Sequence, residues 1–135
     1  MMTPFDREIV ARTLFGEARG EAREGMRAVG HVVFNRFKAA KWYSGKTLAG
    51  TACKRMQFSC WNEADKNRQQ LFELPDDDPT LNLARSLVDD INNGDADPTF
   101  GATHYHATTI APPTWTAGAQ FIVQIGKHRF FKGVV

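Results

Sequence analysis

The stretch ARTLFGEARGEAREGMRAVGHVVFNR, residues 11–36, decides the fold, because two apolar helix patterns meet there at a short polar hinge. In the first pattern apolar residues recur at helical spacing from Val10 onward. The adjoining stripe begins at Ile9 and runs into Glu17. A carboxylate that continues an inward-facing stripe is unusual, since acidic side chains are almost never buried without a partner. Glu17 is therefore a candidate for acid–base chemistry.

The ends of these two helices can be predicted from local signals. The segment TPFD, residues 3–6, has a threonine N-cap, a proline at the first helical position and an acid at the third. Gly20 is expected to end the first helix, because glycine within a helix costs about 1 kcal/mol relative to alanine. The second helix is predicted over residues 23–38 and should be central to the core. Asn35 and Arg36 stand near its end, where polar side chains can reach a neighbouring element.

The middle of the chain has weaker signals. Residues 39–62 are typical of a loop with short helical turns, and residues 63–78 are strongly polar. Asp78 and the proline after it predict the start of another helix, which Gly94 should end.

The character of the sequence changes after this helix. ATHYHA at 102–107 and QFIVQIGKHRFF at 120–131 have the β-branched and aromatic content of strands. We therefore predict an α+β fold, with a mainly helical N-terminal part and a small antiparallel sheet near the C-terminus. At 135 residues the chain is expected to be a single catalytic domain, residues 1–135.

Composition excludes several classes of protein. The chain is 42% hydrophobic with a net charge of +2, and no apolar run reaches the ~18 residues of a membrane span. The start MMTPFDREIV has no hydrophobic segment typical of a secretory signal. We therefore expect synthesis in a cytoplasm. Cys53 and Cys60 are the two cysteines; we expect free thiols, with a disulfide left open for an oxidising compartment.

Several segments together resemble the SleB-like cell wall hydrolases, a family that includes spore cortex-lytic enzymes and phage endolysins. The stretch at 11–36 is followed, in the family's order, by QFSCW at 57–61, DPTFGATHYHA at 97–107, PTW at 113–115 and IGKHRFF at 125–131. The resemblance covers nearly the whole chain. It implies a fold like that of lysozymes and lytic transglycosylases, and cleavage of peptidoglycan glycan strands without a cofactor.

The resemblance also implies a catalytic group. Carried over by position, the family's catalytic glutamate is Glu17, and Glu21 belongs to the same motif. Breaking the β-1,4 bond between N-acetylmuramic acid and N-acetylglucosamine needs a proton on the bridging oxygen. We therefore expect Glu17 in an apolar pocket that favours its protonated form.

Two mechanisms use these glutamates differently. In a lytic transglycosylase the C6 hydroxyl of the substrate attacks C1 and forms a 1,6-anhydromuramic product, so one glutamate can serve as acid and then as base. In a hydrolytic muramidase a second carboxylate is needed, and Glu21 is the candidate, although Gly20 puts its position in doubt. We favour the mechanism with Glu17 alone.

A sugar polymer also needs flat apolar surfaces and hydrogen-bonding groups. The matching segments supply both: Trp61, Tyr105 and Trp115 for stacking, and Gln57, Ser59, Thr103 and His104 for hydrogen bonds.

Three other interpretations remain open. The acidic and basic residues of EARGEARE are also typical of a solvated helix face. A zinc amidase would use His104, His106 and His128, with His31 as a further ligand, although no acid stands at ligand spacing and we expect no metal. A non-catalytic module binding glycan or nucleic acid would use the basic surface and the aromatic residues.

The endolysin resemblance carries further expectations. Peptidoglycan glycan strands are the expected partner, with no nucleic acid and no stable membrane association. We expect a monomer, made in the host cytoplasm without a signal peptide, that reaches the cell wall in the periplasm through a holin-type pore.

Overall fold

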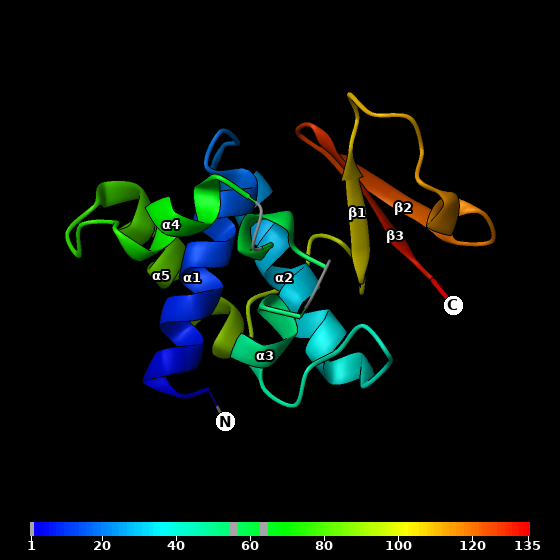
Figure 1. Ribbon diagram of the computed structural model, residues 1–135. Helices are drawn as coiled ribbons and strands as arrows, with labels where there is room; N and C mark the ends of the chain where they lie inside the picture. The colour runs from blue at the N-terminus through cyan, green and yellow to red at the C-terminus, as the bar shows by residue number, and fades with distance from the viewer. Residues whose placement is uncertain (1, 55–56, 63–64) are drawn as a thin grey trace.

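The computed structural model describes residues 2–54, 57–62 and 65–135. Three helices form its main body: α1 (Pro4–Ala18), α2 (Arg23–Ala39) and α5 (Pro79–Asn92), each packed against the other two. A small sheet lies to one side of this body, next to α2 (Figure 1). This arrangement confirms the predicted α+β class. Shorter helices complete the described part of the chain: α3 (Leu48–Ala52), η1 (Ser59–Trp61), α4 (Asn67–Phe72) and η2 (Thr114–Thr116).

The start of α1 is a capping box, as its sequence predicts. Thr3 Oγ1 accepts a hydrogen bond from the Asp6 backbone N–H at 3.1 Å, and Asp6 Oδ2 accepts one from the Thr3 N–H at 2.9 Å. Asp6 Oδ1 also accepts from the Ala49 N–H at 3.0 Å. The cap therefore fixes both the entry of α1 and the position of α3. Helix α1 ends at Ala18, just before the predicted break at Gly20.

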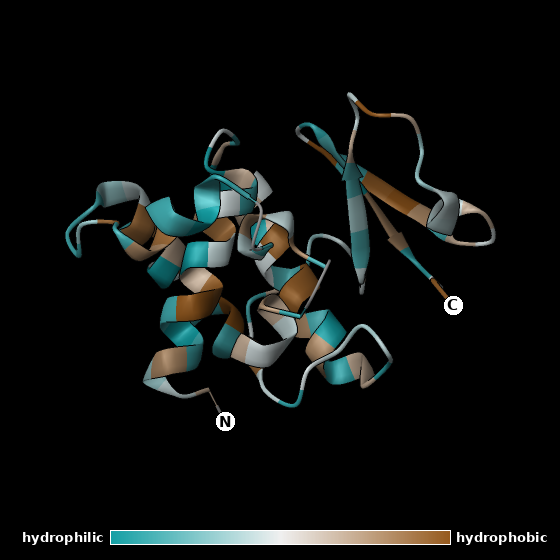
Figure 2. Ribbon diagram, in the orientation of Figure 1, coloured by the Kyte–Doolittle hydropathy of each residue, from teal (hydrophilic) through white to brown (hydrophobic). Residues whose placement is uncertain are grey.

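The hydrophobic core lies between the three long helices. Its fully buried members include Val10 and Leu14 from α1, Val29 and Val33 from α2, and Val88 from α5. Figure 2 shows hydrophobic residues recurring along α1 and α2 between hydrophilic ones. Burial of these side chains is the main favourable term in folding, so α2 is central to the core, as predicted.

The sheet has three antiparallel strands, β1 (His104–Ala107), β2 (Gln120–Ile125) and β3 (His128–Lys132), in the order β1-β3-β2. The segment predicted to have strand character at 120–131 is a hairpin, and Gly126 supplies the positive φ of +59° that its turn requires. Tyr105 pairs with Phe130, so both side chains lie on the same face of the sheet.

Two features of the middle segment differ from the prediction. Helix α4 forms within the polar segment 63–78, where the sequence predicts no helix. Residues 55–56 and 63–64 of the predicted loops lie outside the described residues. No helix among the described residues has the length and apolar character needed to cross a membrane.

Candidate active site

Glu17, near the end of α1, receives hydrogen bonds from two other elements. Its Oε1 accepts from Tyr105 Oη on β1 at 2.9 Å, and its Oε2 accepts from Ser59 Oγ at 3.3 Å and from the Cys60 N–H at 3.4 Å, both on η1. The carboxylate is half-buried. The structure thus joins three elements at Glu17, and it surrounds the carboxylate with polar donors where we expected an apolar pocket.

The groups that contact Glu17 keep their protons at neutral pH. Burial, together with the neighbouring Glu17 carboxylate, raises the pKa of Tyr105 well above its ordinary value, so its hydroxyl remains a donor. The same two causes raise the pKa of the Cys60 thiol. Cys60 is buried and Cys53 is exposed, and both are free thiols. Cys60 is therefore not a thiolate nucleophile at neutral pH.

Glu21 makes its contacts with the sheet. Its Oε1 accepts a hydrogen bond from the Lys127 N–H at 3.0 Å and lies 3.5 Å from His128 Nδ1. A Cβ atom at Gly126 would come within 2.6 Å of Glu21 Oε2. The Glu21 side chain is 12% exposed. These contacts hold the turn of the hairpin against the hinge between α1 and α2, which favours a positioning role over the second catalytic role considered from the sequence.

His128 contacts Glu21 and Tyr105 and lies within the electrostatic influence of Glu17. Burial lowers its pKa, although the Glu21 and Glu17 carboxylates act in the opposite direction. Its ring centroid is 4.9 Å from that of Tyr105. Its Nδ1 is the buried side-chain polar atom that finds no hydrogen-bond partner among the described residues. From the sequence, His128 was a candidate only for the alternative zinc site, although it lies in the family segment IGKHRFF that points to this position.

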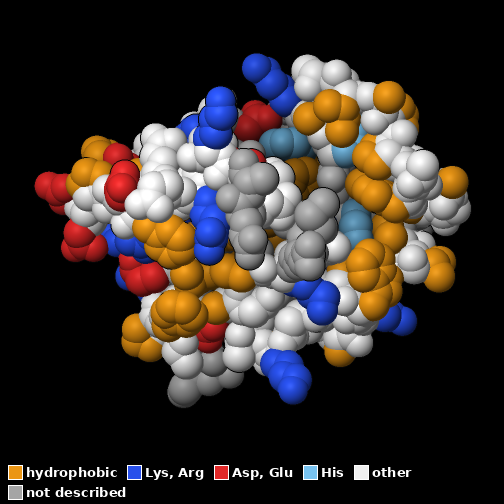
Figure 3. Space-filling model, viewed as in Figure 1, with side chains coloured by type: hydrophobic (Ala, Val, Ile, Leu, Met, Phe, Trp, Pro, Cys, Tyr) orange, Lys and Arg blue, Asp and Glu red, His pale blue; other side chains and the backbone are white. Residues whose placement is uncertain are grey.

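A hollow of about 160 Å³ is lined in part by Tyr105, the residue that donates to Glu17. Four of the predicted substrate residues meet there, namely Gln57, His104, Tyr105 and Trp115. Arg36, Trp42 and Val134 complete the lining. Trp42 and Arg36 were not among the substrate residues predicted from the sequence. Figure 3 shows histidine and apolar side chains along this junction between the helical body and the sheet.

The remaining predicted substrate residues lie at different depths. Ser59 is exposed beside Glu17, and Thr103 Oγ1 lies 3.0 Å from His104 Nδ1. Trp61 is only 9% exposed, and its indole N–H donates to Thr13 Oγ1 at 2.7 Å. The structure therefore gives Trp61 a place in the core, and we remove it from the stacking residues.

Polar side chains at the end of α2 place β1, as their position in the sequence predicts. Asn35 Nδ2 donates to Asp97 Oδ2 at 2.8 Å and to the Ala102 carbonyl at 2.9 Å, and Arg36 Nε donates to the Thr103 carbonyl. Hydrogen bonds from Gly101 and Thr99 to the same Asp97 side chain order the turn before the strand. These contacts lock the segment that presents Tyr105 to Glu17.

The histidines do not form the predicted alternative zinc site. His104 and His106 share one face of β1, whereas His128 pairs with Ala107 and so lies on the opposite face, with Tyr105. Among the described residues, which include all four histidines, no group of three His, Cys, Asp or Glu side chains could hold a metal ion. Burial and the nearby charge of Arg36 lower the pKa of His104 to about 4, so it is neutral at pH 7.

Two solved structures resemble this fold over nearly the whole chain. The catalytic domain of the germination-specific lytic transglycosylase SleB from Bacillus anthracis superposes with a TM-score of 0.76 at 28% identity, covering 97% of each chain. The catalytic domain of the Bacillus cereus SleB protein gives a TM-score of 0.77 at 28% identity, covering 98% of this chain and 93% of that one.

Sequence comparison gives the same result. The spore cortex-lytic enzyme of Oceanobacillus iheyensis is 33% identical over 94% of this chain and 41% of its own length, and that of Bacillus subtilis is 30% identical over 93% and 37%. The chain thus spans about two fifths of the length of these relatives. The profile of the family described as Cell Wall Hydrolase matches residues 20–131. The chain therefore belongs to the cell wall hydrolase family.

Proposed function

We propose that residues 1–135 form a catalytic domain that cleaves the β-1,4 bond between N-acetylmuramic acid and N-acetylglucosamine in peptidoglycan, as a lytic transglycosylase. The observation that carries the proposal is the Glu17 carboxylate, held by Tyr105, Ser59 and Cys60, with Tyr105 also lining a hollow that contains aromatic side chains. The structural neighbour from Bacillus anthracis is itself a lytic transglycosylase, which supports this choice of reaction.

In the proposed mechanism Glu17 has two successive roles. It first protonates the bridging oxygen as the C1–O bond breaks. Its carboxylate then removes the proton from the C6 hydroxyl of the muramyl residue while that oxygen attacks C1 and forms the 1,6-anhydro ring. The proton that Glu17 gives up in the first step is thus recovered in the second. Tyr105 and Ser59 orient the carboxylate through their hydrogen bonds.

The contacts of Glu21 support a mechanism with one glutamate. Its carboxylate is engaged by Lys127 and lies beside His128, so activation of a water molecule would have to compete with the contact that holds the hairpin. A hydrolytic muramidase is therefore the weaker alternative.

The decisive experiment is mass spectrometry of peptidoglycan digested by the wild-type chain and by Glu17→Gln. The wild type should release products with 1,6-anhydromuramic ends, and Glu17→Gln should lose this activity by a factor of 10² or more while keeping its melting temperature. Glu24→Gln is the matched control, because Glu24 belongs to the same acidic stretch and is exposed. Undiminished lysis by Glu17→Gln, or products with new reducing ends, would contradict the proposal.

The endolysin role, the monomeric state and passage through a holin-type pore stay predictions from the sequence. The named relatives are spore cortex-lytic enzymes, so spore cortex and vegetative cell wall peptidoglycan should both be used as substrates in this digestion.

A further inference from the structure

Arg36 is a buried cation without a carboxylate partner in the described ranges 2–54, 57–62 and 65–135. It is 4% exposed, like Arg85 at 7%. Arg85 pairs with Glu8 and Asp76, whereas no ion pair between described residues includes Arg36. Burying a charge without a counter-ion is costly. The cost of burying Arg36 must therefore be offset by some other interaction.

The known contacts of Arg36 use only part of its guanidinium. Nε donates to the Thr103 carbonyl, Nη1 lies 3.4 Å from Gln57 Oε1, and Cζ lies 4.5 Å from the centre of the Phe58 ring. A guanidinium has five N–H donors in a planar fork, and Arg36 also lines the hollow. Its remaining donors find no acceptor among the described residues, so they are open to a ligand there.

The charge of the hollow favours an anion. Burial lowers the pKa of Arg36 to about 10, although the Glu17 carboxylate acts in the opposite direction, so Arg36 is positive at neutral pH. The His104 beside it is neutral. No acidic side chain from the described part of the chain lines the hollow. A planar guanidinium binds carboxylates through paired hydrogen bonds. The chemistry of the lining thus selects a carboxylate.

The size and position of the hollow restrict where this carboxylate comes from. Its volume of about 160 Å³ is below the ~300–1,000 Å³ of pockets that enclose a whole drug-sized ligand, so it suits one substituent of a polymer. Tyr105 lines the hollow and donates to Glu17. The bound substituent therefore belongs to a sugar close to the bond that is cleaved.

We propose that Arg36 and this hollow bind a carboxylate carried by the muramyl residue, next to the bond on which Glu17 acts. This inference rests on the proposed function. The carboxylate belongs either to a lactyl group without a peptide or to the stem peptide attached to it. N-acetylglucosamine has no such group, so Arg36 would set which sugar lies on which side of Glu17.

The test measures binding to glycan strands whose carboxylates are intact or neutralised. Glu17→Gln is titrated calorimetrically with peptide-free strands, with the same strands coupled to methylamine through a carbodiimide, and with peptide-bearing strands before and after that coupling. Loss of a charge-assisted hydrogen bond corresponds to about tenfold or more in Kd. We expect neutralisation to weaken binding by that factor, and Arg36→Met in the Glu17→Gln background to remove the difference. Whichever pair of strands shows the difference identifies the source of the carboxylate.

Arg129→Met is the matched control, because Arg129 is an exposed arginine of β3 that stacks on Phe121 outside the hollow. It removes the same charge, and the preference for intact carboxylates should survive. Equal Kd values for intact and neutralised strands when Arg36 is present would overturn the inference, even if Arg36→Met fails to fold. Failure of the proposed function is a different result: a wild-type chain that cleaves no strand, whatever the binding preference.

Discussion

Tyr105 Oη donates a hydrogen bond to Glu17 Oε1 at 2.9 Å, and this contact ties the sheet to the helical body across 88 positions of sequence. Its geometry depends on Asn35 and Arg36, which hold the start of β1 against α2. The carboxylate is thus oriented by a strand that is itself fixed by helix α2. A substitution of any of these residues should therefore change the orientation of the Glu17 carboxylate.

Tyr105→Phe should lower kcat by about tenfold or more, because a charge-assisted hydrogen bond is worth ~1.5–3 kcal/mol. The hydroxyl orients the Glu17 carboxylate, so its loss should lower kcat more than it raises KM. Steady-state kinetics of Tyr105→Phe on glycan strands test this expectation. A raised KM with an unchanged kcat would mean that Tyr105 acts on substrate binding and not on Glu17.

Glu21→Gln should keep most of the wild-type activity, because the amide oxygen can still accept from the Lys127 N–H. Glu21→Ala should lower the free energy of unfolding by about 0.5–1.5 kcal/mol, since it removes that hydrogen bond while water can still reach the exposed Lys127 N–H. Gly126→Ala should also destabilise, because its Cβ would displace Glu21 Oε2 and φ is positive. Urea unfolding and lysis assays on all three variants provide the test. A loss of activity in Glu21→Gln as large as that in Glu17→Gln would instead support a second catalytic carboxylate.

Trp61→Phe should affect stability, and Trp115→Ala should affect substrate binding. Trp61→Phe removes the buried hydrogen bond to Thr13 and should cost about 1–2 kcal/mol of stability, with KM unchanged. Trp115 is half-buried and lines the hollow, so Trp115→Ala should raise KM for glycan strands. Denaturant midpoints and steady-state kinetics separate the two effects. A raised KM in Trp61→Phe would restore Trp61 to the substrate site.

The helices could be predicted because their signals are local. The cap at Thr3, the proline at residue 79 and the apolar periodicity of residues 23–38 each act within a few positions, and the structure confirms all three helices. Glu17 could be singled out for the same reason, as an acid at the end of an inward-facing stripe. The strand content of the C-terminal segment was also evident, although the turn at Gly126 that makes it a hairpin was not.

Partners distant in the chain could not be predicted. Glu21 contacts Lys127 across 106 positions, and Trp61 contacts Thr13 across 48. The sequence alone does not distinguish a tryptophan in a core from one on a sugar-binding surface. Only tertiary packing decides which of the two positions the side chain takes. Arg36 is similar: its sequence position predicted a polar contact, but the hollow it lines is built from several separate segments.

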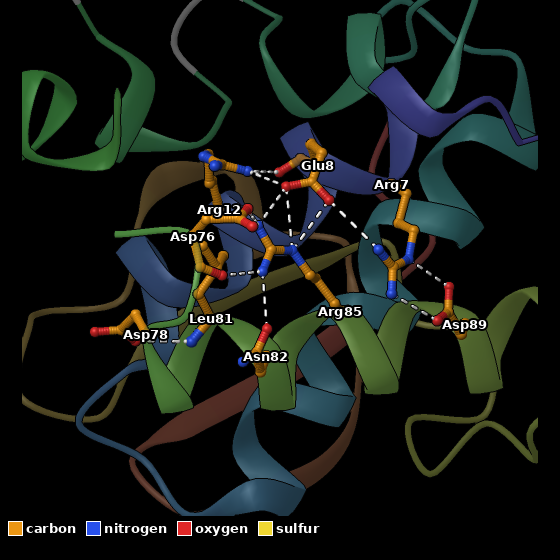
Figure 4. Close-up of polar contacts among 9 residues, drawn as sticks. All are labelled: Arg7, Glu8, Arg12, Asp76, Asp78, Leu81, Asn82, Arg85 and Asp89. Atoms are coloured by element: carbon orange, nitrogen blue, oxygen red, sulfur yellow. Dashed lines mark hydrogen bonds and ion pairs between the residues drawn. The ribbon is translucent and has the colours of Figure 1, made fainter. Parts of the chain in front are cut away.

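The ion pairs of Glu8 should make the free energy of unfolding depend on pH in the acidic range. Its carboxylate accepts from Arg85 Nη2 at 2.7 Å and from Arg12 Nη1 at 2.6 Å (Figure 4). Hydrogen bonding to Arg85 is the main cause that lowers the pKa of Glu8 from 4.5 to about 2. A lowered folded-state pKa means that the stabilisation is complete above pH ~4.5 and is lost as pH falls toward 2.

Glu8→Gln should therefore destabilise the chain at pH 7 by about 1–2 kcal/mol, a value reduced by the 34% exposure of the side chain. The difference from wild type should shrink as pH falls from 4.5 to 2, where the wild-type carboxyl is itself protonated. Asp76→Asn is the matched control: Asp76 also contacts Arg85, at 2.9 Å, but its side chain is 98% exposed, so solvent screening should leave less than about 0.5 kcal/mol. Urea unfolding at pH 7, 4.5 and 2.5 measures both variants. A Glu8→Gln difference that stays constant across this range would show that shape, and not charge, holds α1 against α5.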